Sequence, residues 1–346
     1  MGIGIHLAQM MKSIGSFEHT EFAVQHFHDR VVSEVREAIA TTSAQDVNIF
    51  FGDVDFGVAL KGAKFYWAVF ESSRPPPRFE DWLKRYDFVL SPSQWGIDCM
   101  VRAGLDDRRL LLAPEGVDPL FFHRHGRPTK SRERPFRFLM MGKYETRKGY
   151  EVAFDAFERV FARESEVELW VKPEWISESR VMMAPQCLAL MNRYKHLPIK
   201  WIRGFLNAQQ LLTLHHQTDA FLFPSFGEGW GLPLIEAIAA GTPVICTNFG
   251  GQSQYLNDLS AYVSLIQYEI KPITCEQWRS DRNHPNPELD CWAYPDVAHM
   301  ADLMSELISM PSDRRFRNAT LASDQVRRDF TWIRAADRLL SIIEDL

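Results

Sequence analysis

Short apolar runs alternate with longer amphipathic stretches along most of this chain. The short runs are rich in β-branched and aromatic residues, which is typical of strands buried in a sheet. Strands are predicted at 47–51, 64–70, 87–90, 109–112, 138–141, 167–171, 199–202, 220–223 and 244–246.

The amphipathic stretches predict helices. In 21–41, Val24, Phe27, Val31 and Val35 recur every three to four residues, so they share one helix face. Further helices are predicted at 6–13, 79–84, 95–103, 150–161, 207–216 and 232–240, and in a tail from 295 to 346 that ends with an amphipathic helix at 332–343. The alternation predicts an α/β protein with parallel sheets covered by helices.

Length and pattern together predict two domains. A chain of 346 residues with 46% hydrophobic residues is too long for one ordinary core. The alternation stops near residue 122 and restarts at 136, and the residues between are basic and poor in apolar side chains. We predict an N-terminal domain at 1–123, a linker at 124–135 and a C-terminal domain at 136–325. A final helix at 326–346 is predicted to pack back toward the N-terminal domain. A nucleic-acid-binding arm is the alternative interpretation of the basic linker.

Composition narrows the partners and the location. The formal net charge of −6 argues against nucleic acid as the main partner, because binding to the phosphate backbone needs a basic surface. The five cysteines lack C-x-x-C spacing, and no apolar run reaches the length of a membrane span. We expect a cytoplasmic protein without a signal peptide or a zinc site, with membrane contact that is peripheral at most.

The segment 223–237, FPSFGEGWGLPLIEA, carries the strongest chemical signal. A strand ends at Phe223, and Pro233 stands in the first turn of the next helix, where its missing N–H costs nothing. A helix start presents free N–H groups and a positive dipole end to an anion. Glycines that would let a ligand approach the backbone closely stand at positions Gly227, Gly229 and Gly231.

Two carboxylates flank this anion site. Glu228 lies in the loop, and Glu236 lies in the helix with its side chain tilted back toward the helix start. A ligand with phosphates at one point and hydroxyls on both sides suits this layout, and a nucleotide sugar has that form. The alternative is a loop with surface glutamates.

A basic segment, GKYETRKG at 142–149, follows the first strand of the second half. Lys143, Arg147 and Lys148 could neutralise a diphosphate as it leaves. The segment lacks the P-loop pattern, and a solvated basic turn is the alternative.

Other candidate residues carry weaker signals. Gly2 and Gly4 form a glycine-rich loop before the first predicted helix, with no strand residues ahead of it. The neighbouring His6 is interpreted equally well as facing a cleft or as structural. His215 and His216 are predicted at a partly exposed helix end, without a role. Asp53 and Asp55 follow a strand, but we expect no metal site there.

Together these motifs resemble the retaining glycosyltransferases of family 4, also called glycosyl transferases group 1. That family carries two glutamates separated by seven residues in an E-G-[FW]-G-L-P-x-x-E-A run, which Glu228 to Glu236 matches residue for residue. The resemblance continues at 241–245, 248–251, 91–95 and 114–118 and covers most of residues 60 to 260. It implies the GT-B fold, in which two Rossmann-like domains with parallel sheets face each other across a cleft.

The resemblance also implies roles. Glu228 would contact the hydroxyls of the donor sugar, and Glu236 the nucleotide ribose. Lys148 matches the family lysine on the diphosphate, while Lys143 stands where arginine is usual and keeps the charge without the bidentate fork. Backbone groups that bind the sugar or the phosphates, or that line the cleft, would come from Gly229, Trp230, Gly231, Leu232, Gly142, Gly2 and Gly4.

The family often has a His-Asp pair after a strand of the first domain. This chain has Phe70-Glu71-Ser72-Ser73 instead, so we place Glu71 near the chemistry. The alternative is a strand-end glutamate paired with Arg74.

The sequence thus predicts a retaining transferase that moves a hexose, mannose or glucose, from a nucleotide sugar to an unidentified acceptor. A glycan or lipid-linked precursor is the expected acceptor, and no metal or other cofactor is expected. The alternatives are a non-catalytic GT-B-like protein that binds a sugar nucleotide or a partner, and a GT-B sugar-nucleotide epimerase.

Overall fold

The computed structural model describes residues 47–51, 61–75, 83–127, 134–161, 166–174, 185–274 and 287–345. Several predicted features lie outside these ranges, namely the helices at 6–13 and 21–41, most of the helix at 79–84, and the residues Gly2, Gly4, His6, Asp53 and Asp55.

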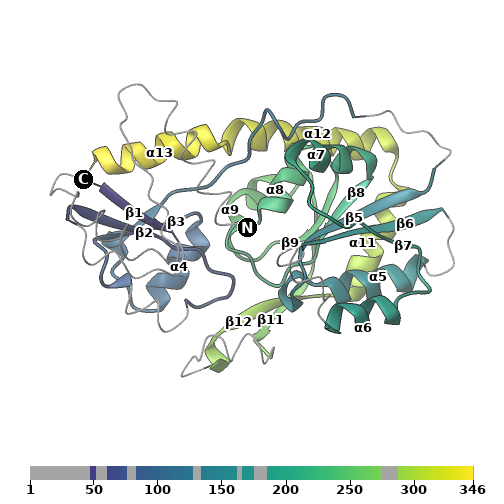
Figure 1. The fold of residues 1–346 in the computed structure, drawn as a ribbon, viewed down its shortest axis with the longest axis horizontal. Coiled ribbons are helices and arrows are strands. Elements are labelled where there is room, and N and C mark those ends of the chain that lie inside the picture. Colours follow the sequence, from purple (N-terminus) through teal and green to yellow (C-terminus); the bar gives the residue numbers. More distant parts are fainter. Residues whose placement is uncertain are drawn as a thin grey trace.

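The first half of the described chain builds a four-stranded parallel sheet in the order β1-β2-β3-β4 (Figure 1). Its strands are β1 (Val47–Phe51), β2 (Ala63–Trp67), β3 (Phe88–Ser91) and β4 (Leu110–Leu112). Helix α4 (Gln94–Arg102) follows β3 and begins at Ser93, whose hydroxyl accepts a hydrogen bond from the Gly96 amide at 3.1 Å.

The second half builds a six-stranded parallel sheet in the order β10-β9-β8-β5-β6-β7. The strands are β5 (Phe136–Lys143), β6 (Val167–Glu174), β7 (Ile199–Trp201), β8 (Ala220–Phe223), β9 (Val244–Thr247) and β10 (Ser264–Ile266). The helices are α5 (Tyr150–Phe161), α6 (Pro185–Arg193), α7 (Ala208–Gln217), α8 (Leu232–Ala239), α9 (Ser253–Leu259), α11 (Val297–Ser309) and α12 (Ser312–Asp329).

Both faces of this larger sheet are buried, which explains its continuous apolar strands. Along β5, Phe138 and Met140 point to a core shared with α5, α6 and α11, because successive side chains of a strand alternate between faces. Leu139 and Met141 point to the opposite core, shared with α7, α8, α9 and α12.

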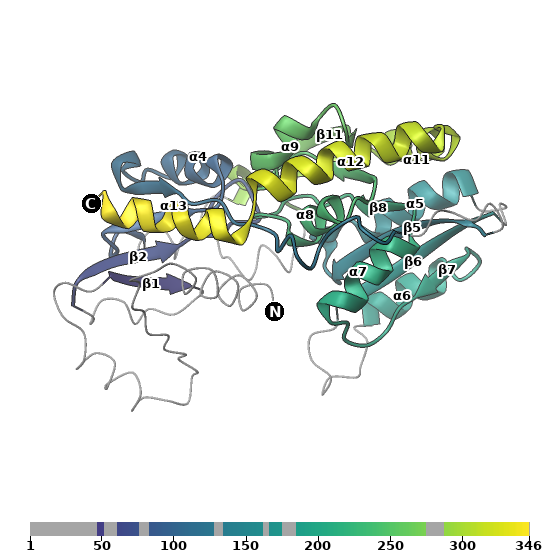
Figure 2. The same cartoon turned by 90° about the horizontal axis from the view of Figure 1, so that it is seen from above.

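The C-terminal helix α13 (Trp332–Glu344) packs on the smaller sheet, not on the larger one. Figure 2 shows α12 and α13, in yellow, running one after the other along the molecule. Leu339 and Ala336 are fully buried in one cluster with Phe65, Trp67 and Leu90. Where α12 gives way to α13, Thr331 forms a parallel bridge with Val117.

A two-stranded antiparallel hairpin of β11 (Tyr268–Pro272) and β12 (Cys291–Pro295) projects away from the larger sheet (Figure 1). The sequence pattern did not predict it, nor the helices α6 and α9 or the strand β10. The predicted strands 47–51 and 220–223 and the helix 150–161 are confirmed with the same bounds, and the other described strands and helices differ at their ends by a few residues. Within the described ranges, no helix has both the length and the hydropathy to span a bilayer.

Candidate active site

The loop 224–231 joins β8 to α8 and has the strand–loop–helix form that the sequence predicts. Gly231 caps α8 with φ of 86°, a left-handed conformation that glycine adopts without strain, and Pro233 stands in the first turn. No side chain caps this helix start. Pro233 has no N–H, and the Leu234 amide donates to the Gly231 carbonyl at 2.9 Å, so the amide of Leu232 is the one at this helix start that no described residue accepts from.

Gly227 and Gly229 allow a close approach by the protein itself. A Cβ on Gly227 would stand 2.5 Å from the Glu71 carbonyl oxygen, and one on Gly229 would stand 2.0 Å from Val69 Cγ1. These two glycines let the segment after β2 lie directly on the loop, and the expected approach of a ligand to their backbone stays a prediction.

Glu228 is almost fully buried within a cluster of charges. Its carboxylate accepts hydrogen bonds from Lys148 Nζ at 2.7 and 2.9 Å and from the Ser225 hydroxyl at 2.5 Å, and it pairs with Arg147 Nη1 at 3.0 Å. Burial alone would raise the pKa of Glu228, but Arg147 and Lys148 outweigh it and lower that pKa to about 2. Glu228 is therefore ionised at neutral pH.

Arg147 lies behind Glu228, and only 2% of its side chain is exposed. Besides Glu228, the guanidinium donates to the Gly227 carbonyl at 2.7 Å, to Glu71 at 2.7 Å and to Glu145 at 3.0 Å. Despite burial, these three carboxylates raise the pKa of Arg147 above its ordinary value. The alternative of a solvated basic turn therefore does not hold for Arg147, because its Nη donors are occupied by protein oxygens.

Glu71 comes from the segment after β2 and joins this cluster through Arg147. The alternative pairing with Arg74 is not the one observed. The Glu71 backbone is also fixed, since its carbonyl accepts the Trp292 indole N–H at 2.9 Å. Trp292 belongs to β12 and packs on Phe226 in the loop. The unpredicted hairpin thus supports both Glu71 and the loop.

The predicted phosphate-side residues lie at the end of β5. Gly142 has φ of 143°, and a Cβ there would lie 3.8 Å from the Lys148 side chain. Lys143 is half-buried, and no described residue forms an ion pair with it. The structure therefore brings Lys148, Glu228 and Glu71 into one cluster through Arg147, and among the described residues no ion pair joins Lys143 to it.

Glu236 is half-buried on α8, four residues after the first turn begins. Burial raises its pKa to about 8, and no described residue pairs with its carboxyl group. The indole of Trp230 packs on Tyr255 and Phe330, and the residue is 2% exposed. Only the backbone of Trp230, with that of Leu232, can line the site.

His215 corrects another expectation. It is fully buried rather than partly exposed, and desolvation lowers its pKa to about 3, so it is neutral. His216 is half-buried and contacts the His123 carbonyl oxygen at 2.8 Å. Among the described residues, no cluster of His, Cys, Asp and Glu has the grouping of a metal site.

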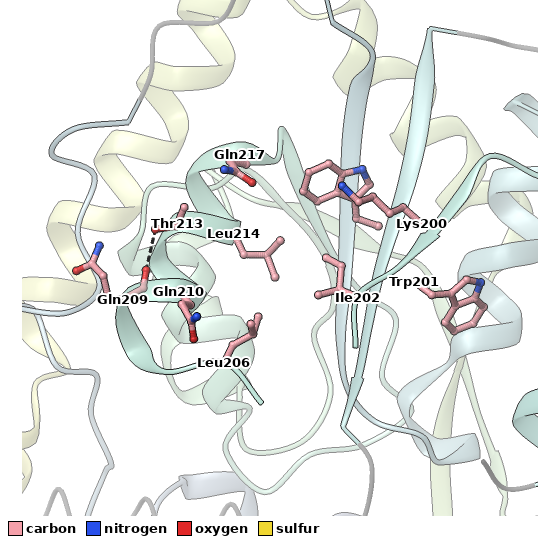
Figure 3. Close-up of a pocket in the computed structure, with 10 residues that line it drawn as sticks. Lys200, Trp201, Ile202, Leu206, Gln209, Gln210, Thr213, Leu214 and Gln217 are labelled. Atoms are coloured by element: carbon pink, nitrogen blue, oxygen red, sulfur yellow. Dashed lines mark hydrogen bonds between the residues drawn. The ribbon is translucent and has the colours of Figure 1, made fainter. Parts of the chain in front are cut away.

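A hollow of 380 Å³ lies elsewhere, between the β6–β7 edge of the larger sheet and α7. Figure 3 shows its lining side chains, with Lys200 and Ile202 on one side, Gln210 and Leu214 of α7 on the other, and Leu206 next to Gln210. Lys200 Nζ lies 4.0 Å from the centre of the Trp170 ring. None of the predicted site residues lines this hollow.

Solved structures of similar shape define the class of this fold. An α,α-trehalose-phosphate synthase (UDP-forming) from Burkholderia vietnamiensis aligns with a TM-score of 0.67 and 14% identity, over 90% of this chain and 77% of that one. Anabaena Alr3699/HepE, solved in complex with UDP and glucose, aligns with a TM-score of 0.65 and 13% identity, over 93% and 84% of the two chains. The chain has the GT-B fold.

The sequence comparisons agree with the resemblance. The glycosyl transferases group 1 model matches residues 123–268, which include Lys148, Glu228 and Glu236. Glycogen synthase from Mycobacterium tuberculosis is 27% identical over 251 residues, or 70% of this chain. The chain spans 56% of the length of that curated relative.

Proposed function

We propose that this chain is a retaining glycosyltransferase that moves a hexose, glucose or mannose, from a nucleoside-diphosphate sugar to a glycan or lipid-linked acceptor. The observation that carries the proposal is the contact of Lys148 with Glu228 beside the open start of α8. A cation, a carboxylate and the positive end of a helix match the phosphate and the hydroxyls of such a donor.

In this proposal each group has one task. The diphosphate lies against the start of α8, Lys148 and Lys143, which stabilise the charge that develops as it leaves. Glu228 accepts hydrogen bonds from the hydroxyls of the donor sugar, and Glu236 binds the ribose. Glu71 faces the acceptor, and the leaving phosphate takes the proton of the acceptor hydroxyl. Retention of the anomeric configuration rests on the resemblance to family 4.

The same assignment proposes a reaction without a bound metal. Lys143, Lys148 and the helix start supply the positive charge that Mg²⁺ supplies in many phosphoryl and glycosyl transfers. Turnover is therefore expected to be unchanged by EDTA, with and without added Mg²⁺. A requirement for the metal would contradict this part of the proposal.

The decisive experiment measures nucleoside diphosphate release from UDP-, GDP- and ADP-hexoses by the purified chain, alone and with candidate sugar acceptors. Glu228→Gln should lower turnover by about 100-fold or more, while UDP or GDP binds within about threefold of the parent, since Glu228 acts on the sugar. Glu168→Gln is the matched control, because Glu168 is also an ion-paired glutamate of this half, bound to Arg137.

Two outcomes would contradict the proposal. Tight binding of a sugar nucleotide without release would favour the non-catalytic alternative. Equal loss of activity in Glu228→Gln and Glu168→Gln would remove Glu228 from the reaction.

A further inference from the structure

Arg147 joins carboxylates that the two sheets contribute from opposite sides. Glu71 follows β2 of the smaller sheet, while Glu145 and Glu228 belong to loops of the larger one. One guanidinium contacts all three, at 2.7, 3.0 and 3.0 Å. Arg147 is therefore the point at which the acceptor-side and donor-side carboxylates of the proposed reaction are held together.

The arrangement uses the planar fork of arginine. Nη1 donates to the Gly227 carbonyl and pairs with Glu228, and Nη2 donates to Glu71 and Glu145. Four acceptors exceed what the three donors of a lysine ammonium can satisfy. Because the guanidinium is also 2% exposed, it has neither a spare Nη donor nor an open path to a diphosphate.

Lys148 contacts the same carboxylate but is placed differently. Its side chain is 10% exposed, and among the described residues Nζ forms an ion pair with Glu228 alone. A flexible ammonium can exchange one partner for another, whereas the guanidinium of Arg147 is fixed by four. When a diphosphate draws Lys148 away, Arg147 is the cation that stays with Glu228.

We propose that Arg147 is a positioning residue of the transfer reaction, which keeps Glu228 and Glu71 in fixed relative positions while Lys148 passes from Glu228 to the donor diphosphate. This inference rests on the proposed function. It assigns the two neighbouring cations opposite tasks, with Lys148 binding substrate and Arg147 binding only protein.

The charges around Glu228 support this division. Arg147 and Lys148 face it from one segment, the Ser225 hydroxyl faces it from the loop, and Tyr255 of α9 lies close enough for Glu228 to raise its pKa. Three carboxylates share two cations here. A buried carboxylate that loses its last cation is strongly destabilised in its ionised form. Without the Arg147 fork, Glu228 would take up a proton at a higher pH.

The test compares Arg147→Lys with the parent and with Arg137→Lys. Arg137 is a matched control because it is also an arginine ion-paired to a glutamate of the larger sheet, at 3.1 Å. Three quantities are measured with whichever hexose donor the parent cleaves: kcat and KM, the pH profile of kcat, and the Kd of the corresponding UDP, GDP or ADP.

In Arg147→Lys we expect kcat to fall by about 100-fold with the nucleoside diphosphate Kd within about threefold. The acid limb of the pH profile should move to higher pH. A merely structural role would lower the amount of folded protein without moving that limb. Arg137→Lys should leave all three quantities unchanged.

Two results would overturn the inference while leaving the proposed function intact. One is an Arg147→Lys enzyme with parental kcat and an unmoved acid limb. The other is parental kcat at saturating donor with nucleoside diphosphate binding weakened by about 100-fold, which would mean that Arg147 binds the diphosphate. A parent that releases no nucleoside diphosphate from any donor would instead refute the proposed function, and this inference with it.

Discussion

At the scale of single residues, burial and neighbouring charge give the two carboxylates of the loop–helix unit different pKa values. Glu228 meets two cations and has a pKa of about 2. Glu236 is half-buried without a cationic partner among the described residues, and desolvation raises its pKa to about 8. At neutral pH the first is an acceptor only, while the second carries a proton.

Glu236 predicts a pH dependence of nucleotide binding. Below about pH 8 the free protein holds Glu236 protonated. Ribose hydroxyls that donate to its carboxylate favour the ionised form, so binding lowers its pKa and releases a proton. The affinity for UDP or GDP should therefore rise between about pH 6 and pH 8. Calorimetry in buffers of different ionisation enthalpy measures the released proton.

Glu236→Gln is the control for this prediction, because the nucleotide phosphates also titrate in the same range. The variant should lose the part of the proton release that Glu236 contributes. Equal proton release by parent and variant would mean that Glu236 does not bind the ribose.

The sequence predicts Glu228, Glu236 and Lys148 as site residues because they lie in short motifs, the two glutamates in 223–237 and the lysine in 142–149. It does not predict the partners of Arg147, which come from segments that are far apart in the chain. A segment such as 143–148, with three basic residues, carries no information on which of the three is buried. Only the fold, which brings Glu71 to within 2.7 Å, makes Arg147 a buried cation and Lys148 the more exposed one.

At the scale of elements, glycines set how closely loops of the site can approach. Gly251 stands after β9, and its amide donates to the Glu228 carbonyl at 2.6 Å. A Cβ there would lie 1.6 Å from the Gly229 carbonyl oxygen, so the loop at 228–230 would have to move.

Gly251→Ala should therefore lower the free energy of unfolding by about 1–3 kcal/mol through steric strain. The matched control is Gly104→Ala, where φ is 92° but nothing lies within 4 Å of the new Cβ. That change should cost only the conformational strain of about 1–2 kcal/mol. Urea unfolding and donor turnover are measured for both.

Turnover separates the two glycines more sharply than stability does. Gly251→Ala should also impair turnover, because Glu228 lies in the displaced loop, whereas Gly104→Ala should keep parental turnover. Equal activity of the two variants would show that the loop tolerates the displacement.

The hairpin of β11 and β12 marks the limit of element prediction from sequence. Tyr268 and Ile270 alternate with Glu269 and Lys271, which is a strand pattern that could have been recognised. Its position could not, since β11 is exposed along its length and pairs only with β12. The contacts that hold it at the site, such as the Trp292 indole on Glu71, are made between distant segments.

At the scale of the whole molecule, the last helix completes the first sheet. Trp332, Leu339 and Ile342 pack with Phe65 and Trp67. The amphipathic pattern at 332–343 predicts the helix but not the sheet that it covers, because periodicity identifies a buried face and not its partner. The strand order β10-β9-β8-β5-β6-β7 is equally non-local, since it depends on crossovers.

Leu339→Ala tests the importance of this packing. Leu339 is fully buried, so its truncation should lower the free energy of unfolding by about 2–5 kcal/mol. Leu321→Ala on α12 is the control, because Leu321 is 43% exposed and its loss should change stability by about 0.5 kcal/mol. Chemical denaturation measures both, and equal stabilities would mean that α13 adds little to the core of the first sheet.

The return of α13 to the first sheet also sets the order of events during synthesis. Strands β1 to β4 leave the ribosome before the whole of the larger sheet, and their helical cover emerges last. At about 5–20 residues per second, the face around Phe65 and Trp67 waits about 10–50 s for that cover. A nascent chain stalled before Trp332 would therefore display an aromatic surface of the kind that chaperones and proteases recognise.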